Sequence, residues 1–82
     1  MKARVRVTLK SAVLDPQGKA IGNALASLGF TGIDAVRQGK LIELDLAETD
    51  PARTREQVEA MCKQLLANPV IEDYAIEVMP PD

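Results

Sequence analysis

Side chains that commonly carry out catalysis are scarce in this chain. It has no histidine, and its one thiol belongs to Cys62, which stands between Met61 and Leu65 in a run with helical periodicity. A cysteine nucleophile needs an adjacent base, and a thiol on an apolar stripe is typically inert and serves packing. We therefore expect Cys62 to be a buried core residue and the chain to carry no catalytic residue.

Acidic side chains occur in two close pairs, Glu43 with Asp45 and Glu72 with Asp73. These positions fall on strands, whereas calcium and magnesium are usually bound by oxygen ligands gathered in a loop. Zinc would require histidine or further cysteine ligands. The pairs therefore indicate solvated or cross-strand paired residues, and we expect no metal site.

A turn at residues 37–40 places two cations, Arg37 and Lys40, around Gly39. Such a turn could hold an anion or the carboxylate of a partner. Basic residues in turns are also commonly only solvated. The composition of the turn leaves both interpretations open.

The elements that would position these residues follow from the periodicity of the chain. Residues 4–10 alternate between apolar and polar side chains, which predicts a half-buried strand. A helix over residues 16–28 should follow, because Asp15 can cap its first amides, Pro16 can open it and Gly29 offers a left-handed C-terminal cap. Its apolar stripe consists of Ala20, Ile21, Ala24, Leu25 and Leu28.

Residues 33–47 can be interpreted in two ways. Two short strands, over residues 33–37 and 41–47, would be joined by a tight turn at Gln38 and Gly39. The alternative is one long strand that bends at Gly39. We favour the two strands.

A second helix begins with Asp50 as its cap and Pro51 at its first position, and Pro69 ends it. Its apolar stripe consists of Val58, Met61, Cys62, Leu65 and Leu66. The last strand covers residues 71–78, and residues 80–82 form a frayed tail.

This order of elements, in a single domain over residues 1–82, predicts a two-layer α+β fold. The β-α-β-β-α-β order is typical of the split β-α-β arrangement of ferredoxins, an antiparallel sheet with two helices on one face. The first strand exposes basic side chains, whereas the third and last strands expose acidic ones. We expect the first strand between these two, since opposite charges across strands contribute about 0.2–1 kcal/mol per pair.

Composition excludes several kinds of partner. The chain has 82 residues, a formal net charge of -2 and a pI near 5.0, so it has no overall positive field to attract nucleic acid or acidic lipid. No apolar run is long enough to span a membrane, and the first residues do not resemble a signal peptide. We expect a cytoplasmic protein that binds neither nucleic acid nor membrane.

Other functions of this fold fit the sequence less well. An RNA-recognition domain needs aromatic residues on its central strands, and the aromatic residues here are Phe30 and Tyr74. An acylphosphatase-like enzyme would need an arginine in a glycine-rich turn after the first strand, and residues 11–15 supply neither. A small-molecule-binding regulatory domain of the ACT type stays as the alternative.

Two blocks of sequence carry a resemblance to a known family. Residues 14–18, Leu-Asp-Pro-Gln-Gly, and residues 65–72, Leu-Leu-Ala-Asn-Pro-Val-Ile-Glu, occur in this order with Val-Arg-Gln-Gly-Lys at 36–40 between them. With these blocks the chain resembles the PurS family, the small subunit of phosphoribosylformylglycinamidine synthase, from about Ala3 to Val78. The resemblance implies a role in purine biosynthesis.

The resemblance also implies the partners of the chain. The synthase uses ATP and glutamine to convert formylglycinamide ribonucleotide (FGAR) to the formylglycinamidine (FGAM). A large subunit (PurL) uses ATP and Mg and makes the C–N bond, and a glutaminase subunit (PurQ) releases ammonia. The small subunit would be non-catalytic, bind no cofactor, form a homodimer or tetramer, and bridge the other two so that ammonia passes between them.

We expect two segments, residues 15–18 and residues 37–40, to contact partner subunits. The residues concerned are Asp15, Gln17, Gly18, Arg37, Gly39 and Lys40. In the predicted fold the two segments lie at opposite ends of the domain, where a connector could touch two partners at once.

Overall fold

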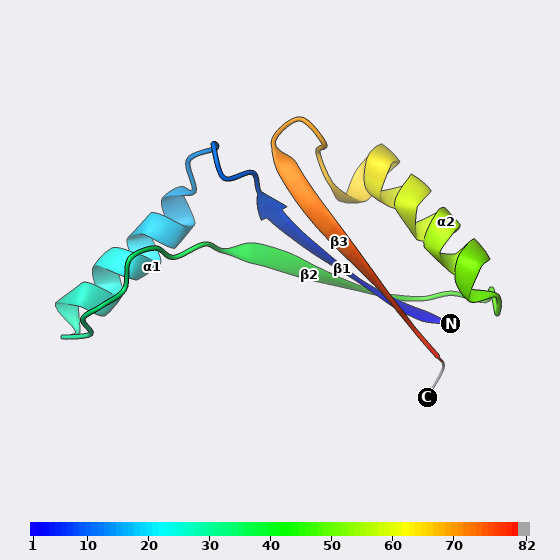
Figure 1. Ribbon diagram of the computed structural model, residues 1–82, viewed down its shortest axis with the longest axis horizontal. Helices are drawn as coiled ribbons and strands as arrows, with labels where there is room; N and C mark the ends of the chain where they lie inside the picture. The colour runs from blue at the N-terminus through cyan, green and yellow to red at the C-terminus, as the bar shows by residue number, and fades with distance from the viewer. Residues whose placement is uncertain (81–82) are drawn as a thin grey trace.

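The computed structural model describes residues 1–80, and the rest of the predicted tail lies outside them. Within the described residues the chain forms three strands, two α-helices and one π-helical turn (Figure 1). In chain order these are β1 (Lys2–Leu9), α1 (Pro16–Ser27), β2 (Gly39–Asp45), α2 (Pro51–Met61), η1 (Cys62–Leu66) and β3 (Glu72–Met79). The α+β class and the antiparallel sheet with two helices are confirmed.

The sheet has the order β2-β1-β3, with both pairings antiparallel. The first strand therefore lies between the acidic strands, as the charge pattern predicts. Arg4 lies opposite both Glu43 and Glu77, and the Lys10 Nζ atom is 2.8 Å from the Asp73 carboxylate. These side chains are substantially exposed, so each ion pair adds little stability. Their main effect is on strand order and register.

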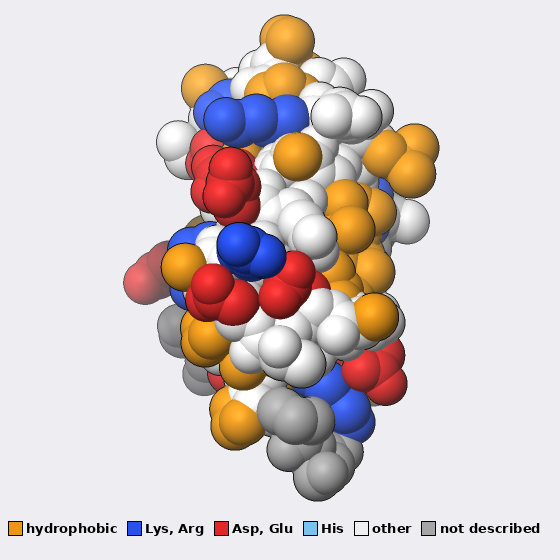
Figure 2. Space-filling model, turned by 90° about the vertical axis from the view of Figure 1, so that its right-hand side faces the viewer, with side chains coloured by type: hydrophobic (Ala, Val, Ile, Leu, Met, Phe, Trp, Pro, Cys, Tyr) orange, Lys and Arg blue, Asp and Glu red, His pale blue; other side chains and the backbone are white. Residues whose placement is uncertain are grey.

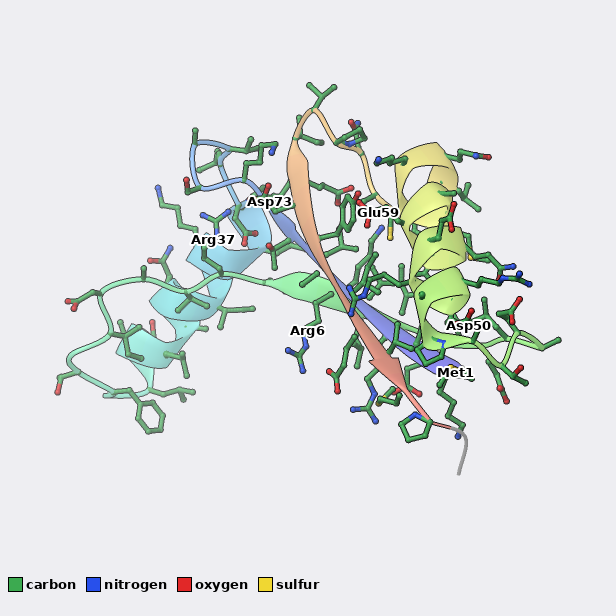
Figure 3. The ribbon with its side chains drawn as sticks, turned by 45° about the vertical axis from the view of Figure 1, so that its right-hand side comes forward. Met1, Arg6, Arg37, Asp50, Glu59 and Asp73 are labelled. Carbon is green, nitrogen blue, oxygen red and sulfur yellow. The ribbon has the colours of Figure 1, made fainter. Side chains whose placement is uncertain are left out.

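One face of the sheet packs against α2, and the core lies between them. The buried apolar residues are Ala3, Val5, Val7, Val58, Cys62 and Ala67. Asp50 caps α2 by accepting a hydrogen bond from the Ala52 amide, and the buried Thr54 hydroxyl donates to the Asp50 carbonyl. Cys62 is fully buried, which confirms its predicted packing role. On the opposite face, Arg6 points away from α2 (Figure 3).

Residues 33–37 differ from the prediction, because they form no strand. The chain passes through Gln38 and Gly39 without reversing and continues directly into β2 (Figure 1). The tight turn predicted there is wrong, and the path resembles the alternative long strand, of which only the half from Gly39 onward is paired. The reason is that β1 ends at Leu9, so it offers no backbone partner to residues 33–37.

The first helix also lies elsewhere than predicted. Among residues 1–80, α1 is not packed on the sheet or on α2 and instead projects to the side (Figure 1). Residues 14–38, which we call the α1 arm, consist of α1, a reversal at Gly29 and Gly32, and the extended segment 33–38. Both glycines have positive φ, 93° and 82°, where other residues are strained. The prediction of both helices on one sheet face is therefore not met in the single chain.

Candidate functional site

The two segments singled out by sequence meet at the base of the α1 arm. One carboxylate oxygen of Asp15, Oδ1, accepts a hydrogen bond from the Gly18 amide at 2.9 Å, which caps α1. The other oxygen, Oδ2, accepts from the Gln38 amide at 2.8 Å. The prediction that these segments lie at opposite ends of the domain is wrong, because residues 33–38 return alongside α1 instead of turning into a hairpin.

Side chains extend this junction in two directions. The Gln38 amide group donates through Nε2 to Gln17 Oε1. Arg37 donates through Nη2 to the carbonyl oxygens of Leu9 and Lys10, at the point where β1 ends. Arg37 therefore binds backbone within its own chain, and Figure 3 shows it at the base of the arm. Gln38 was not among the predicted site residues, although its place between Arg37 and Gly39 could have suggested it.

The two glycines of the site allow close approach of backbone. A Cβ atom added to Gly18 would lie 2.5 Å from the Val36 carbonyl oxygen and 2.7 Å from Asp15 Oδ2. A Cβ atom added to Gly39 would overlap the Val7 carbonyl oxygen. Neither glycine has a positive φ, so both positions need glycine for lack of space. Gly18 is the one buried residue of α1.

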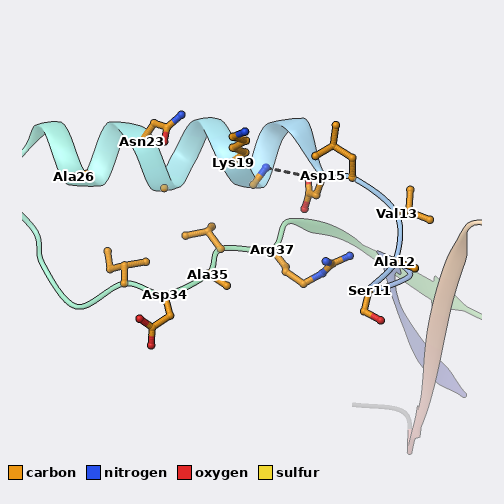
Figure 4. A pocket seen from close by; sticks show the side chains of 15 residues that line it. Ser11, Ala12, Val13, Asp15, Lys19, Asn23, Ala26, Asp34, Ala35 and Arg37 are labelled. Atoms are coloured by element: carbon orange, nitrogen blue, oxygen red, sulfur yellow. Dashed lines mark hydrogen bonds between the residues drawn. The ribbon is translucent and has the colours of Figure 1, made fainter.

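A groove of about 670 Å³ runs between α1 and residues 33–37 (Figure 4). Its polar lining includes Lys19, Asn23, Asp34 and Arg37, and Figure 4 shows α1 and the extended segment side by side. Lys40, the remaining predicted site residue, lies in a smaller groove beside Gln17 and Gln38. The structure thus gathers all six predicted residues near one junction.

Electrostatics distinguish the two titratable groups of interest. Hydrogen bonds from the Gln38 and Gly18 amides, with the nearby Arg37 charge, lower the pKa of Asp15 below its usual value. Burial raises the pKa of the Cys62 thiol, and the Glu59 carboxylate raises it further. Asp15 is therefore kept as a carboxylate that accepts hydrogen bonds, whereas Cys62 is kept as a neutral thiol, which is a poor nucleophile.

Two further observations concern metal sites and membrane-spanning helices in the described part of the chain. Residues 1–80 contain no group of three histidine, cysteine, aspartate or glutamate side chains placed to hold a metal ion. No helix there is long and apolar enough to cross a membrane. The α2 side of the surface shows acidic and basic side chains interspersed with apolar ones (Figure 2).

Fold and site together define a small α+β domain with a three-stranded antiparallel sheet, in which the one thiol is buried and the polar side chains of the site contact backbone within the chain. The PurS family model, described as phosphoribosylformylglycinamidine (FGAM) synthase, matches residues 2–80. This chain belongs to the PurS family.

Relatives match over nearly the whole chain. The PurS subunit of phosphoribosylformylglycinamidine synthase from Synechocystis is 49% identical over 92% of this chain and 75% of its own length. The crystal structure of PurS from Methanocaldococcus jannaschii has a TM-score of 0.89 at 44% identity, covering 99% of this chain and 98% of that one. A chain in the structure of PurLQS from Thermotoga maritima gives a TM-score of 0.86 at 31% identity, with 95% of both chains covered.

Proposed function

We propose that this chain is the non-catalytic small subunit of phosphoribosylformylglycinamidine synthase and bridges the large synthase subunit and the glutaminase subunit. The observation that carries the proposal is the match, across almost its full length, to a chain in a PurLQS structure. The Methanocaldococcus jannaschii relative is likewise described as one of the subunits of formylglycinamide ribonucleotide amidotransferase. In this role the chain works as one domain, within a cytoplasmic complex.

The division of labour follows from the chemistry that this chain can supply. ATP and Mg are used by the large subunit, ammonia is released from glutamine by the glutaminase, and this chain assists the transfer of ammonia between them. The neutral, buried Cys62 and the absence of histidine support a role without bond making. The chain itself binds no cofactor.

The chain acts as a homodimer or as a tetramer built from dimers. The α1 arm supports this proposal, because its large apolar side chains are exposed: Leu28 by 73%, Phe30 by 58% and Ile33 by 43%. Residues 33–37 also form no strand pairing, and an extended segment of this kind can pair with another chain. A second copy would cover the apolar side chains and satisfy the backbone.

Contacts with the partner subunits are proposed at the six residues of the arm base. These are Asp15, Gln17, Gly18, Arg37, Gly39 and Lys40. Gln17 and Lys40 are exposed there, whereas Gly18 is buried, so Gln17 and Lys40 would provide the direct side-chain contacts. The others would shape the backbone that presents them.

Reconstitution tests the proposal. The large subunit and the glutaminase are assayed for glutamine-dependent FGAM formation, in the presence and absence of this chain. We expect activity to require the chain, and we expect added ammonium to restore activity without it, because external ammonia bypasses the transfer step. Full glutamine-dependent activity without the chain would contradict the proposal. Binding of an amino acid or nucleotide to the isolated chain would favour the ACT-type alternative.

A further inference from the structure

The α1 arm is joined to the rest of the molecule through one small junction. Within residues 1–80, α1 is not packed on the sheet or on α2, so the apolar core does not fix the position of the arm. Two backbone connections cross the junction, one at residues 10–15 and one at residues 37–39. The angle between the arm and the sheet must therefore be set by the contacts at these connections.

Asp15 provides the central contact. Its two carboxylate oxygens accept from two different parts of the chain, the first turn of α1 at Gly18 and the residue directly before β2, Gln38. An aspartate can accept at both oxygens, whereas an asparagine has one acceptor oxygen and an NH₂ group that would face an amide donor. The geometry therefore requires a carboxylate and not only a helix cap.

Neighbouring residues complete the junction. The Gln38 side chain donates to Gln17, which links α1 a second time to the residue that directly precedes β2. Arg37 donates to the carbonyl oxygens of Leu9 and Lys10, which links the arm to the end of β1. Gly18 lets α1 lie directly against the Val36 carbonyl, where a Cβ atom would not fit.

We propose that Asp15, Gln17, Gly18, Arg37 and Gln38 form a clasp that fixes the angle of the α1 arm relative to the sheet. The clasp thereby positions the apolar side chains of the arm for a second copy of this chain, a step that rests on the proposed dimer. Opening the clasp frees the arm and leaves the core between α2 and the sheet intact.

A pair of glycine substitutions in α1 tests the clasp. Alanine is a better helix former than glycine at both Gly18 and Gly22. A Cβ atom at Gly22 would meet Val36 side-chain carbons at 3.5 and 3.9 Å, which is ordinary contact, whereas one at Gly18 would overlap Val36 and Asp15. We expect Gly18→Ala to speed hydrogen exchange of the Gln38 amide about tenfold, while Gly22→Ala leaves it unchanged or slower.

In a second pair of substitutions, each variant removes one negative charge from the α1 arm. Asp15→Asn loses one acceptor of the clasp, while Asp34→Asn, its control, changes an exposed aspartate that has no hydrogen bond or ion pair among the described residues. We expect Asp15→Asn to speed exchange in residues 33–38, with β1 and α2 still protected, and to weaken dimerisation in sedimentation. Asp34→Asn should leave exchange as in the wild type.

The outcomes separate the clasp from the proposed dimer. Equal acceleration in β1, α2 and the arm for Gly18→Ala and Asp15→Asn would refute the clasp, since the contacts would then serve global stability. Unchanged exchange at Gln38 in both variants would refute it as well. A wild type that stays monomeric would overturn the dimer, and the exchange pattern would still decide whether the clasp holds the arm.

Discussion

Cys62 shows how the environment of one residue decides its role. The thiol is fully buried against the sheet, and burial and the Glu59 carboxylate raise its pKa, so it is neutral. We expect Cys62→Ser to destabilise the fold by about 1–3 kcal/mol, because a buried hydroxyl loses apolar packing and needs a hydrogen-bond partner. Urea unfolding measures this cost, and an unchanged midpoint would mean that the residue is exposed in solution.

The same reasoning predicts that the isolated chain turns over no glutamine. A neutral thiol without histidine cannot carry out the attack that a glutaminase requires. An assay for glutamate release from glutamine checks this. Turnover that disappears in Cys62→Ser would contradict it.

Asp15 predicts a dependence of stability on pH. Its folded-state pKa lies below the ordinary value, so its stabilising contribution is complete above that value and is lost as the pH falls through the lowered pKa. We expect acid to release the Gln38 amide before the core unfolds. NMR titration of the Asp15 carboxyl, with Asp15→Asn as reference, measures the shift. A midpoint at or above the ordinary aspartate value would contradict the clasp geometry.

At the scale of elements, the interface between α2 and the sheet gives a matched pair of substitutions. Val58 is fully buried on α2, whereas Leu65, four residues into the π-helical turn that continues it, is 83% exposed. Val58→Ala should cost about 2 kcal/mol through lost burial and the cavity left behind. Leu65→Ala deletes more side chain, yet it should change stability by less than about 0.5 kcal/mol. Equal costs would contradict this packing.

Periodicity predicted most of those elements whose faces are covered within the single chain. Strand β1 alternates as expected, and Asp15 and Asp50 cap the helices that follow them. From the stripe predicted for the second helix, Val58 of α2 and Cys62 of η1 are buried, whereas Met61 and Leu65 are exposed. Local sequence was sufficient here, because each feature depends on neighbouring residues or on charges directly across a strand.

The α1 arm could not be predicted in the same way. An apolar stripe indicates that a helix will be covered, but it does not say by what, and the stripe of α1 leaves Ile21 and Leu28 exposed. A glycine after a polar residue, as at Gln38 and Gly39, is typical of a tight turn. In the structure Gly39 instead lets the backbone approach the Val7 carbonyl closely. The six site residues were predicted from their sequence blocks, whereas the contact between Asp15 and Gln38 depends on the path of the whole arm.

The whole molecule is extended for its size, with principal extents of 48 × 30 × 15 Å and a radius of gyration of 16.1 Å. A compact chain of about 100 residues would have a radius near 13 Å. The difference reflects the projecting arm, whose apolar side chains stay exposed in the single chain. The shape therefore favours an assembly in which another chain completes the second layer.

This shape predicts that the arm, and not the α2 end, controls self-association. Leu28→Glu places a charge on the exposed apolar side of the arm, whereas Leu65→Glu places the same charge at a comparably exposed leucine in η1, which follows α2. Because burying an unpaired charge is costly, Leu28→Glu should weaken the proposed dimer by at least about tenfold in dissociation constant. Leu65→Glu should leave the dimer intact, since its added charge stays in water. Both variants should keep the melting temperature of the core, because neither side chain belongs to it.

Sedimentation over a concentration series measures the change in dissociation constant. Dissociation by Leu65→Glu with no effect of Leu28→Glu would move the interface to the opposite end of the molecule.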